Sequence, residues 1–225
     1  MNETSRRSMD VTSMFVVAWV LATGLILPVP RAFQAQDVVK DFDGNSYRTV
    51  TIGRQLWMAE NLRSTRSCTG TPIAHDAYAG RQDLVKTYGR LYTEAAARNG
   101  EAPSTANPSQ VRGICPCGWH LPSDAEWQQL VDFLGGPVVA GGKLKARGTG
   151  QWKSPNAGAT DESSFTALPG GFRDFEGQYE GLGDRAFFRS ATGMRARFVR
   201  SDDAAVGAGN IHSRDAASVR CVKDQ

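Results

Sequence analysis

The residues best suited to chemistry lie in one short stretch, GICPCGWHLPSDAEWQQL, which spans residues 113–130. Cys115, Cys117 and His120 offer thiols and an imidazole, groups that bind zinc or copper and support redox chemistry. Their spacing argues for another role, because structural metal sites usually place two residues between cysteines and only Pro116 separates these. We expect disulfides here and keep a metal or redox site as the alternative.

The chain contains four cysteines, and all of them follow an N-terminal segment typical of exported proteins. An even number of cysteines in an oxidising compartment predicts two disulfides. A bond between Cys115 and Cys117 would close a tight, strained ring, which leaves two arrangements. We favour Cys115 with Cys221 and Cys68 with Cys117, while the crossed arrangement stays open. Either arrangement ties the end of the chain to its middle.

Oxygen-bearing side chains occur at two places where a hard cation could bind. Asp161 and Glu162, near Asn156, carry the oxygens that calcium prefers, but a turn cap formed by Asp161 is the simpler interpretation. Residues 41–45, DFDGN, resemble the start of a calcium loop, yet no glutamate follows at the twelfth position, so we interpret them as a turn. We predict no cofactor, because calcium is chemically possible here but no standard motif supports it.

Tryptophans and polar residues of the second half supply the candidate ligand-binding positions. Trp57, Trp119 and Trp127 sit in regular apolar patterns and are expected in the core. Trp152 lies in a loop with glycine and proline, where an exposed ring could stack on a sugar or a protein partner. No serine or cysteine nucleophile can be matched to a base, so no catalytic residue is predicted. The candidate ligand-binding residues are Trp152, Asn156, Asp161, Glu162, Arg173 and Tyr179.

Sequence patterns before residue 148 predict the helices that could position these residues. Ser123 and Glu126 form a capping box that starts a helix near Asp124. Apolar residues follow at the i, i+3, i+4 and i+7 positions from Trp127, and a glycine pair at 135–136 ends the helix. Composition and periodicity predict a β-hairpin over residues 47–58, a surface loop over 63–86 and short helical segments over 89–99 and 137–146.

The part of the chain after residue 147 has a strand-type sequence pattern, and this pattern indicates the fold class. Residues 148–225 are rich in glycine and carry short apolar runs separated by turn residues, the pattern of an antiparallel sheet. Two or three short helices, an opening hairpin and later strands predict an α+β domain. We expect the final strand, residues 218–223, to pair with the opening one. The N- and C-terminal strands would then be adjacent.

The N-terminus predicts export. Residues 14–27, MFVVAWVLATGLIL, form an apolar run behind two arginines, and this run is shorter than the roughly 20 residues that a membrane span needs. We interpret residues 1–36 as a signal peptide, with an uncleaved anchor as the alternative. Residues 37–225 then form a single domain. The protein is predicted to be secreted, either extracellular or periplasmic.

The charge pattern narrows the choice of partners. The formal net charge is +3, and basic residues are interspersed with acidic ones throughout the chain. Nucleic-acid-binding proteins usually gather basic residues on one face, so nucleic acid is not an expected partner. A membrane is expected only through the N-terminal segment, if that segment stays uncleaved.

Blocks spread over most of the chain resemble the Fibrobacter succinogenes major paralogous domain, a family of exported bacterial modules. LPSDAEW, at residues 121–127, is also similar to the helix-start block of the formylglycine-generating, sulfatase-modifying family. The domain of that family is a variant of the C-type lectin-like fold, so the resemblance implies this fold. The matching blocks are DGN at 43–45, WMAENL at 57–62, YGRLY at 88–92, GICPCGWHLPSDAEW at 113–127, ATDES at 159–163, ALPGG at 167–171 and SVRCVKD at 218–224.

The chain departs from both related activities. The formylglycine-generating enzymes use a late pair of cysteines, whereas the second half here holds only Cys221; the calcium-binding tripeptides of sugar-binding C-type lectins do not occur. We therefore expect a non-catalytic binding or structural module at the bacterial surface, which presents loops of residues 151–189 to a glycan or protein partner. The alternative is a metal-dependent or cysteine-based oxidase that uses Cys115, Cys117 and His120.

Overall fold

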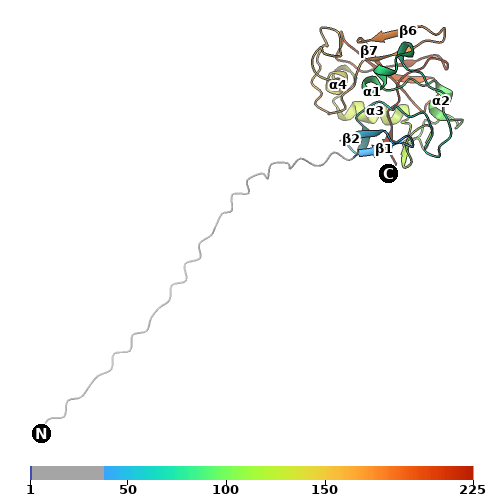
Figure 1. Ribbon diagram of the computed structural model, residues 1–225. Coiled ribbons are helices and arrows are strands. Elements are labelled where there is room, and N and C mark those ends of the chain that lie inside the picture. Colours follow the sequence, from blue (N-terminus) through green and yellow to red (C-terminus); the bar gives the residue numbers. More distant parts are fainter. Residues whose placement is uncertain (2–37, 225) are drawn as a thin grey trace. The chain divides into compact units, whose positions relative to one another are not determined.

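The computed structural model describes Met1 and residues 38–224, so the predicted signal segment over 1–36 lies, apart from Met1, outside the described residues. The elements from β1 onward form two five-stranded sheets with short helices, an α+β architecture (Figure 1). The first sheet, in spatial order, contains β1 (Val38–Lys40), β2 (Ser46–Ile52), β3 (Gln55–Met58), β10 (Val222–Lys223) and β4 (Trp119–His120). The second contains β6 (Tyr179–Leu182), β5 (Gly170–Arg173), β7 (Arg185–Arg189), β8 (Arg195–Arg200) and β9 (Gly207–Asn210).

The helices are short, as the sequence predicts. The alanine-rich segment forms α2, which Thr93 caps by accepting a hydrogen bond from the Ala96 amide. The surface loop predicted over residues 63–86 contains two 3-10 turns and the start of α1. No helix among the described residues is long and apolar enough to cross a membrane. The helical elements are η1 (Tyr78–Gly80), η2 (Gln82–Leu84), α1 (Val85–Tyr88), α2 (Glu94–Arg98), α3 (Asp124–Phe133) and α4 (Pro137–Leu144).

The first sheet confirms the opening hairpin and corrects the position of the last strand. β2 pairs antiparallel with β3 across a turn at Gly53, whose φ is +62°. The final strand was expected beside the opening one, but β10 pairs with β3 through Val222 and Trp57. The other edge of β2 is occupied by β1, which the sequence pattern did not predict. The terminal strands therefore share a sheet but are not neighbours.

The second sheet differs from the expected antiparallel arrangement at one pairing. β5 pairs in parallel with β7 through Gly171 and Ala186, while the remaining pairings are antiparallel. The alternation of apolar and polar residues reports which face of a strand is buried, and it does not report which strand lies beside it. The mixed sheet is therefore a tertiary feature.

The helix α3 joins the two sheets through its apolar face. The capping box is present, since Ser123 accepts from the Glu126 amide and Glu126 accepts from the Ser123 amide. The Trp127 ring centroid lies 4.6 Å from that of Trp57 on β3 and 5.4 Å from that of Phe188 on β7. All three rings are buried, and Trp119 is buried as well, so the core assignment of Trp57, Trp119 and Trp127 is confirmed.

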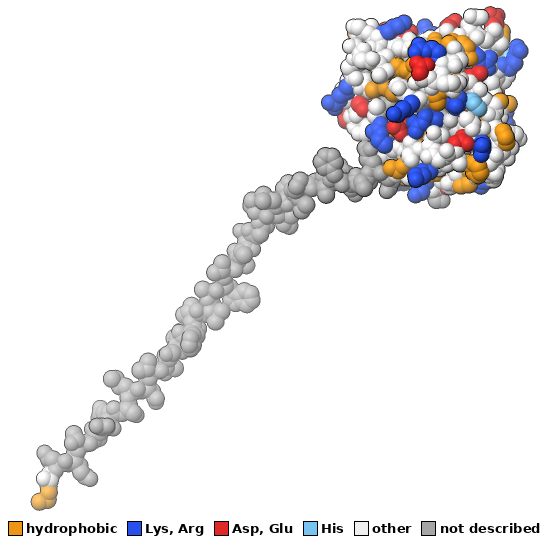
Figure 2. Space-filling view, in the orientation of Figure 1, with side chains coloured by type: hydrophobic (Ala, Val, Ile, Leu, Met, Phe, Trp, Pro, Cys, Tyr) orange, Lys and Arg blue, Asp and Glu red, His pale blue; other side chains and the backbone are white. Residues whose placement is uncertain are grey.

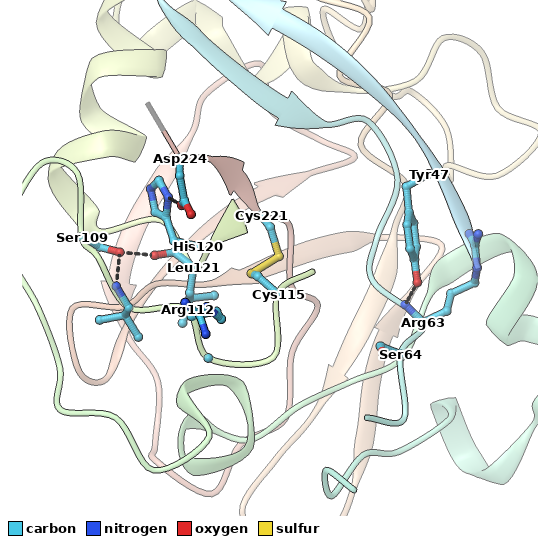
Figure 3. The surroundings of a disulfide bond; sticks show 12 residues. Tyr47, Arg63, Ser64, Ser109, Arg112, Cys115, His120, Leu121, Cys221 and Asp224 are labelled. Carbon is cyan, nitrogen blue, oxygen red and sulfur yellow. Dashed lines mark hydrogen bonds and ion pairs between the residues drawn. A yellow bond between two sulfur atoms is a disulfide. The ribbon is translucent and has the colours of Figure 1, made fainter. Parts of the chain in front are cut away.

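A second buried cluster forms around a disulfide. Cys115 is bonded to Cys221 and Cys68 to Cys117, with Cα–Cα distances of 5.9 and 5.2 Å, and this is the arrangement that the sequence favoured. Cys115 and Cys221 are fully buried and join the loop before β4 to the segment that leads into β10 (Figure 3). The chain end is thereby fastened to the interior of the domain.

Candidate functional site

Trp152 is a core residue, so its prediction as a ligand-stacking aromatic is wrong. Only 1% of its surface is exposed, and its Nε1 donates to the Ala167 carbonyl at 3.0 Å. The surrounding loop folds back on α4, where the Thr160 amide donates to the Gly142 carbonyl at 2.8 Å. Loop position suggested exposure, but the ring belongs to the main core cluster, together with Leu144 and Phe165.

The polar candidates near Trp152 mainly shape their own loop. Asn156 is buried, and its Nδ2 donates to the carbonyls of Ala146 and Gly148 at 2.9 and 2.7 Å. Asp161 accepts from the amide and hydroxyl of Thr166, the capping role that was the simpler interpretation. Within residues 38–224, no group of three or more His, Cys, Asp or Glu side chains is arranged to hold a metal ion.

The remaining candidates lie elsewhere. Glu162 is exposed and lies 3.7 Å from the Lys143 ammonium. Arg173 and Tyr179 are cross-strand partners on β5 and β6. The Arg173 Nε donates to Asp76 at 2.7 Å, and the Tyr179 ring lies 5.2 Å from that of Tyr78. The predicted ligand residues are therefore divided between the loop region around Trp152 and the β5–β6 pair.

A different part of the surface forms a cavity of about 560 Å³. This volume falls in the range of about 300–1,000 Å³ that is typical of ligand sites. We call it the cationic groove. On the face drawn in Figure 2, Lys and Arg side chains are interspersed with Asp and Glu side chains. The groove is lined by Asn45, Ser46, Glu60, Arg63, Gln82, Val85, Lys86 and Arg90.

Two segments that are distant in sequence meet to form the groove. Asn61 Nδ2 donates to the Tyr88 carbonyl at 2.8 Å, and the Arg90 amide donates to the Leu62 carbonyl at 2.9 Å. Gly89 makes this approach possible, since its φ is +80° and an added Cβ would lie 2.5 Å from the Asn61 Cβ. The close contact places the residues after β3 against the end of α1.

The two arginines that line the groove are held in defined positions. The Arg63 guanidinium lies 4.5 Å from the Tyr47 ring centroid, and its Nη2 donates to the Ser46 carbonyl at 2.7 Å. The Arg90 Nε donates to the Arg63 carbonyl at 3.1 Å. Lys86 is exposed on α1 and makes no hydrogen bond or ion pair with any described residue. Its ammonium is available to a ligand.

The groove continues into a small recess of about 60 Å³ that contains two more arginines. Arg48 lies 3.6 Å from Glu60, the one carboxylate among the described residues that line the groove and recess. Arg220 is fully buried at the recess floor, where its Nε donates to the Asn61 side chain at 2.8 Å. Five cations thus face one carboxylate, and a negatively charged ligand would be attracted.

These groove residues were not among the sequence-based candidates. Arginine and lysine are frequent throughout the chain, so their types alone carried little information. Two sequence blocks could have indicated this site, WMAENL over 57–62 and YGRLY over 88–92. Both resemble the Fibrobacter succinogenes major paralogous domain. The close approach of these two blocks at Gly89 brings their polar residues together in one groove.

A buried charge network lies near the Cys115–Cys221 bond. His120 is 3% exposed, and its Nδ1 and Nε2 lie 2.7 and 2.6 Å from carboxylate oxygens of Asp224 and Glu126. Burial alone would lower the pKa of His120, but hydrogen bonds and charge from Glu126 and Asp224 outweigh it and raise the pKa above 6.5. Figure 3 shows His120 facing Asp224 beside the disulfide. The network fastens the C-terminal residues to β4 and α3.

This network predicts a pH dependence of stability. Because the folded-state pKa of His120 is raised, the protonated ring stabilises the fold below about pH 6.5. That contribution is lost as the pH rises through the folded-state pKa. We expect the free energy of unfolding to fall with pH over this interval in the native sequence, and to fall less in His120→Gln. Urea titrations at several pH values measure both slopes, and identical slopes would contradict the assignment.

The fold and the cavity together define a disulfide-braced α+β domain with a cationic groove. The sequence model of the Fibrobacter succinogenes major domain matches residues 50–223. The chain belongs to this family. Comparisons with curated proteins and with solved structures give no match.

Proposed function

We propose that the protein is an exported, non-catalytic binding module that recognises a negatively charged glycan or protein partner through the cationic groove. The observation that carries the proposal is Lys86, which is exposed and has no partner among residues 38–224. It lies beside Arg63 and Arg90, whose positions are fixed by local hydrogen bonds. Pre-positioned cations lose little freedom on binding an anion. Loops on a rigid scaffold of the C-type lectin-like kind would present the groove to the partner.

Export is supported by two features of the chain. The apolar segment over residues 14–27 has the length of a signal peptide, and both disulfides suit an oxidising compartment. We propose that the mature domain acts outside the cytoplasm, in the periplasm or beyond the cell surface. Its partner would meet it there, and no nucleic acid is required.

The oxidase alternative receives less support. Cys115 and Cys117, which would have acted together with His120, are each bonded to a distant cysteine. A disulfide-bonded sulfur is not a thiolate, and thiolate is the form that attacks or binds metal. The His120 ring is also engaged by two carboxylates. A structural role is therefore the better explanation of this region.

The proposal predicts that reversing one charge weakens binding. Lys86→Glu should lower the affinity for anionic probes at least about tenfold, because a favourable charge becomes a repulsive one in a groove with few acids. Calorimetric titration with polyglutamate, sulfated dextran and oligogalacturonate, at two salt concentrations, measures the effect. Lys40→Glu, an exposed lysine on β1, is the matched control. Absence of binding by all three probes would contradict the proposal.

A further inference from the structure

Uncharged residues also line the cationic groove, and few of them are apolar. Val85 is the only large aliphatic side chain among the described residues that line its main cavity, and no aromatic ring lines it. Protein partners usually anchor through apolar or aromatic side chains that fill matching pockets. A groove of this composition provides little for such an anchor.

Polar groups that are free to bond surround the cations. The hydroxyls of Ser46, in the main cavity, and Thr87, in the recess, make no hydrogen bond within the described part of the chain. The Asn45 Nδ2 donates to Asp41 at 2.8 Å, which leaves the side-chain carbonyl oxygen of Asn45 available. The Gln82 Oε1 accepts from Arg90 at 3.4 Å, which leaves the Gln82 Nε2 available as a donor. These neutral donors and acceptors match a ligand rich in hydroxyl groups.

The Arg63 guanidinium adds a geometric preference. Its contact with the Tyr47 ring and its bond to the Ser46 carbonyl hold the group in place. A fixed guanidinium presents parallel N–H donors, which match the paired oxygens of a carboxylate or sulfate. Lys86 can supply a second, more mobile positive charge to the same ligand.

We infer that the cationic groove binds an acidic glycan, whose carboxylate or sulfate groups meet Arg63 and Lys86 while its hydroxyls bond Ser46 and Thr87. This inference rests on the proposed function and specifies the class of ligand. Charge alone would suit an acidic peptide equally well, but the hydroxyl and amide groups and the small number of apolar lining residues favour a sugar chain.

Calorimetric titrations with chemically matched probes test the charge requirement. Oligogalacturonate carries carboxylates on sugar rings, its methyl ester keeps the rings without the charge, and polyglutamate carries carboxylates without sugars; a sulfated oligosaccharide tests the other anion. We expect an acidic glycan to bind at least about tenfold more tightly than either the methyl ester or polyglutamate. Lys86→Gln should weaken that binding, whereas Lys40→Gln should not.

Hydroxyl-deleting variants test the sugar requirement. Ser46→Ala and Thr87→Val should each weaken binding of the acidic glycan by about two- to tenfold, as expected for one lost hydrogen bond, and should leave polyglutamate binding unchanged. Thr51→Val, at an exposed position on β2, is the matched control, and circular dichroism verifies the fold of each variant. Lys86-dependent binding of polyglutamate with no glycan binding would overturn this inference and leave the proposed function standing. Absence of binding by every anionic probe would overturn both.

Discussion

Replacing Cys115 and Cys221 together by alanine is expected to lower the free energy of unfolding by about 4–5 kcal/mol or more. The bond closes a loop with a sequence separation of 106 residues, so its loss frees a large part of the unfolded chain. Both sulfurs are fully buried, and the smaller alanines would also leave unfilled space in the second core cluster. The double variant avoids an unpaired thiol. Urea unfolding of the oxidised proteins, with thiol titration to verify oxidation, measures the loss.

Removal of the other bond provides an internal comparison. Cys68 and Cys117 span 49 residues, and Cys117 is exposed. Loop length changes the entropy only logarithmically, so the two losses should differ by less than about 1 kcal/mol from that cause. Burial should make the Cys115–Cys221 loss the larger. An equal or smaller loss at Cys115 and Cys221 would show that packing around this bond contributes little.

Replacing Arg220 by methionine is expected to cost about 2–4 kcal/mol of stability, because buried acceptors would lose their donor. Its guanidinium donates to the Asn61 side chain at 2.8 Å, to the Thr166 carbonyl at 3.0 Å and to the Phe165 carbonyl. It also lies 4.1 Å from the Phe165 ring centroid. Burial lowers the pKa of Arg220 to about 9, so the group stays charged at neutral pH.

Two effects on stability oppose each other in Arg220→Met, and a second variant, Arg220→Lys, separates them. Methionine removes the cost of burying a charge but leaves three acceptors unpaired, and the second effect should dominate. Arg220→Lys keeps the charge without the planar set of donors. If the donors matter most, Arg220→Lys should also be destabilised, in spite of its charge. Thermal unfolding measures both variants, and a stability equal to that of the native protein in Arg220→Met would contradict the argument.

Local sequence patterns determined the elements of this protein. Ser123 and Glu126 specify the start of α3 because a capping box needs only residues three positions apart. The hairpin of β2 and β3 follows from alternation around a glycine turn, and the burial of Trp57 and Trp127 follows from their apolar periodicity. The four cysteines predicted two disulfides, because they are even in number and follow an export-type segment. These features depend on neighbours along the chain.

Tertiary structure alone decided the partners of these elements and the place of the site. β10 lies beside β3 because β1 occupies the other edge of β2. The sequence pattern of a strand does not indicate which of two strands will pair with a given edge. Trp152 is buried because its loop folds back on α4, whereas loop composition suggested exposure. The cationic groove exists because Gly89 allows residues 60–63 to approach residues 86–90. Contacts between distant segments depend on how the whole chain closes, which no local spacing encodes.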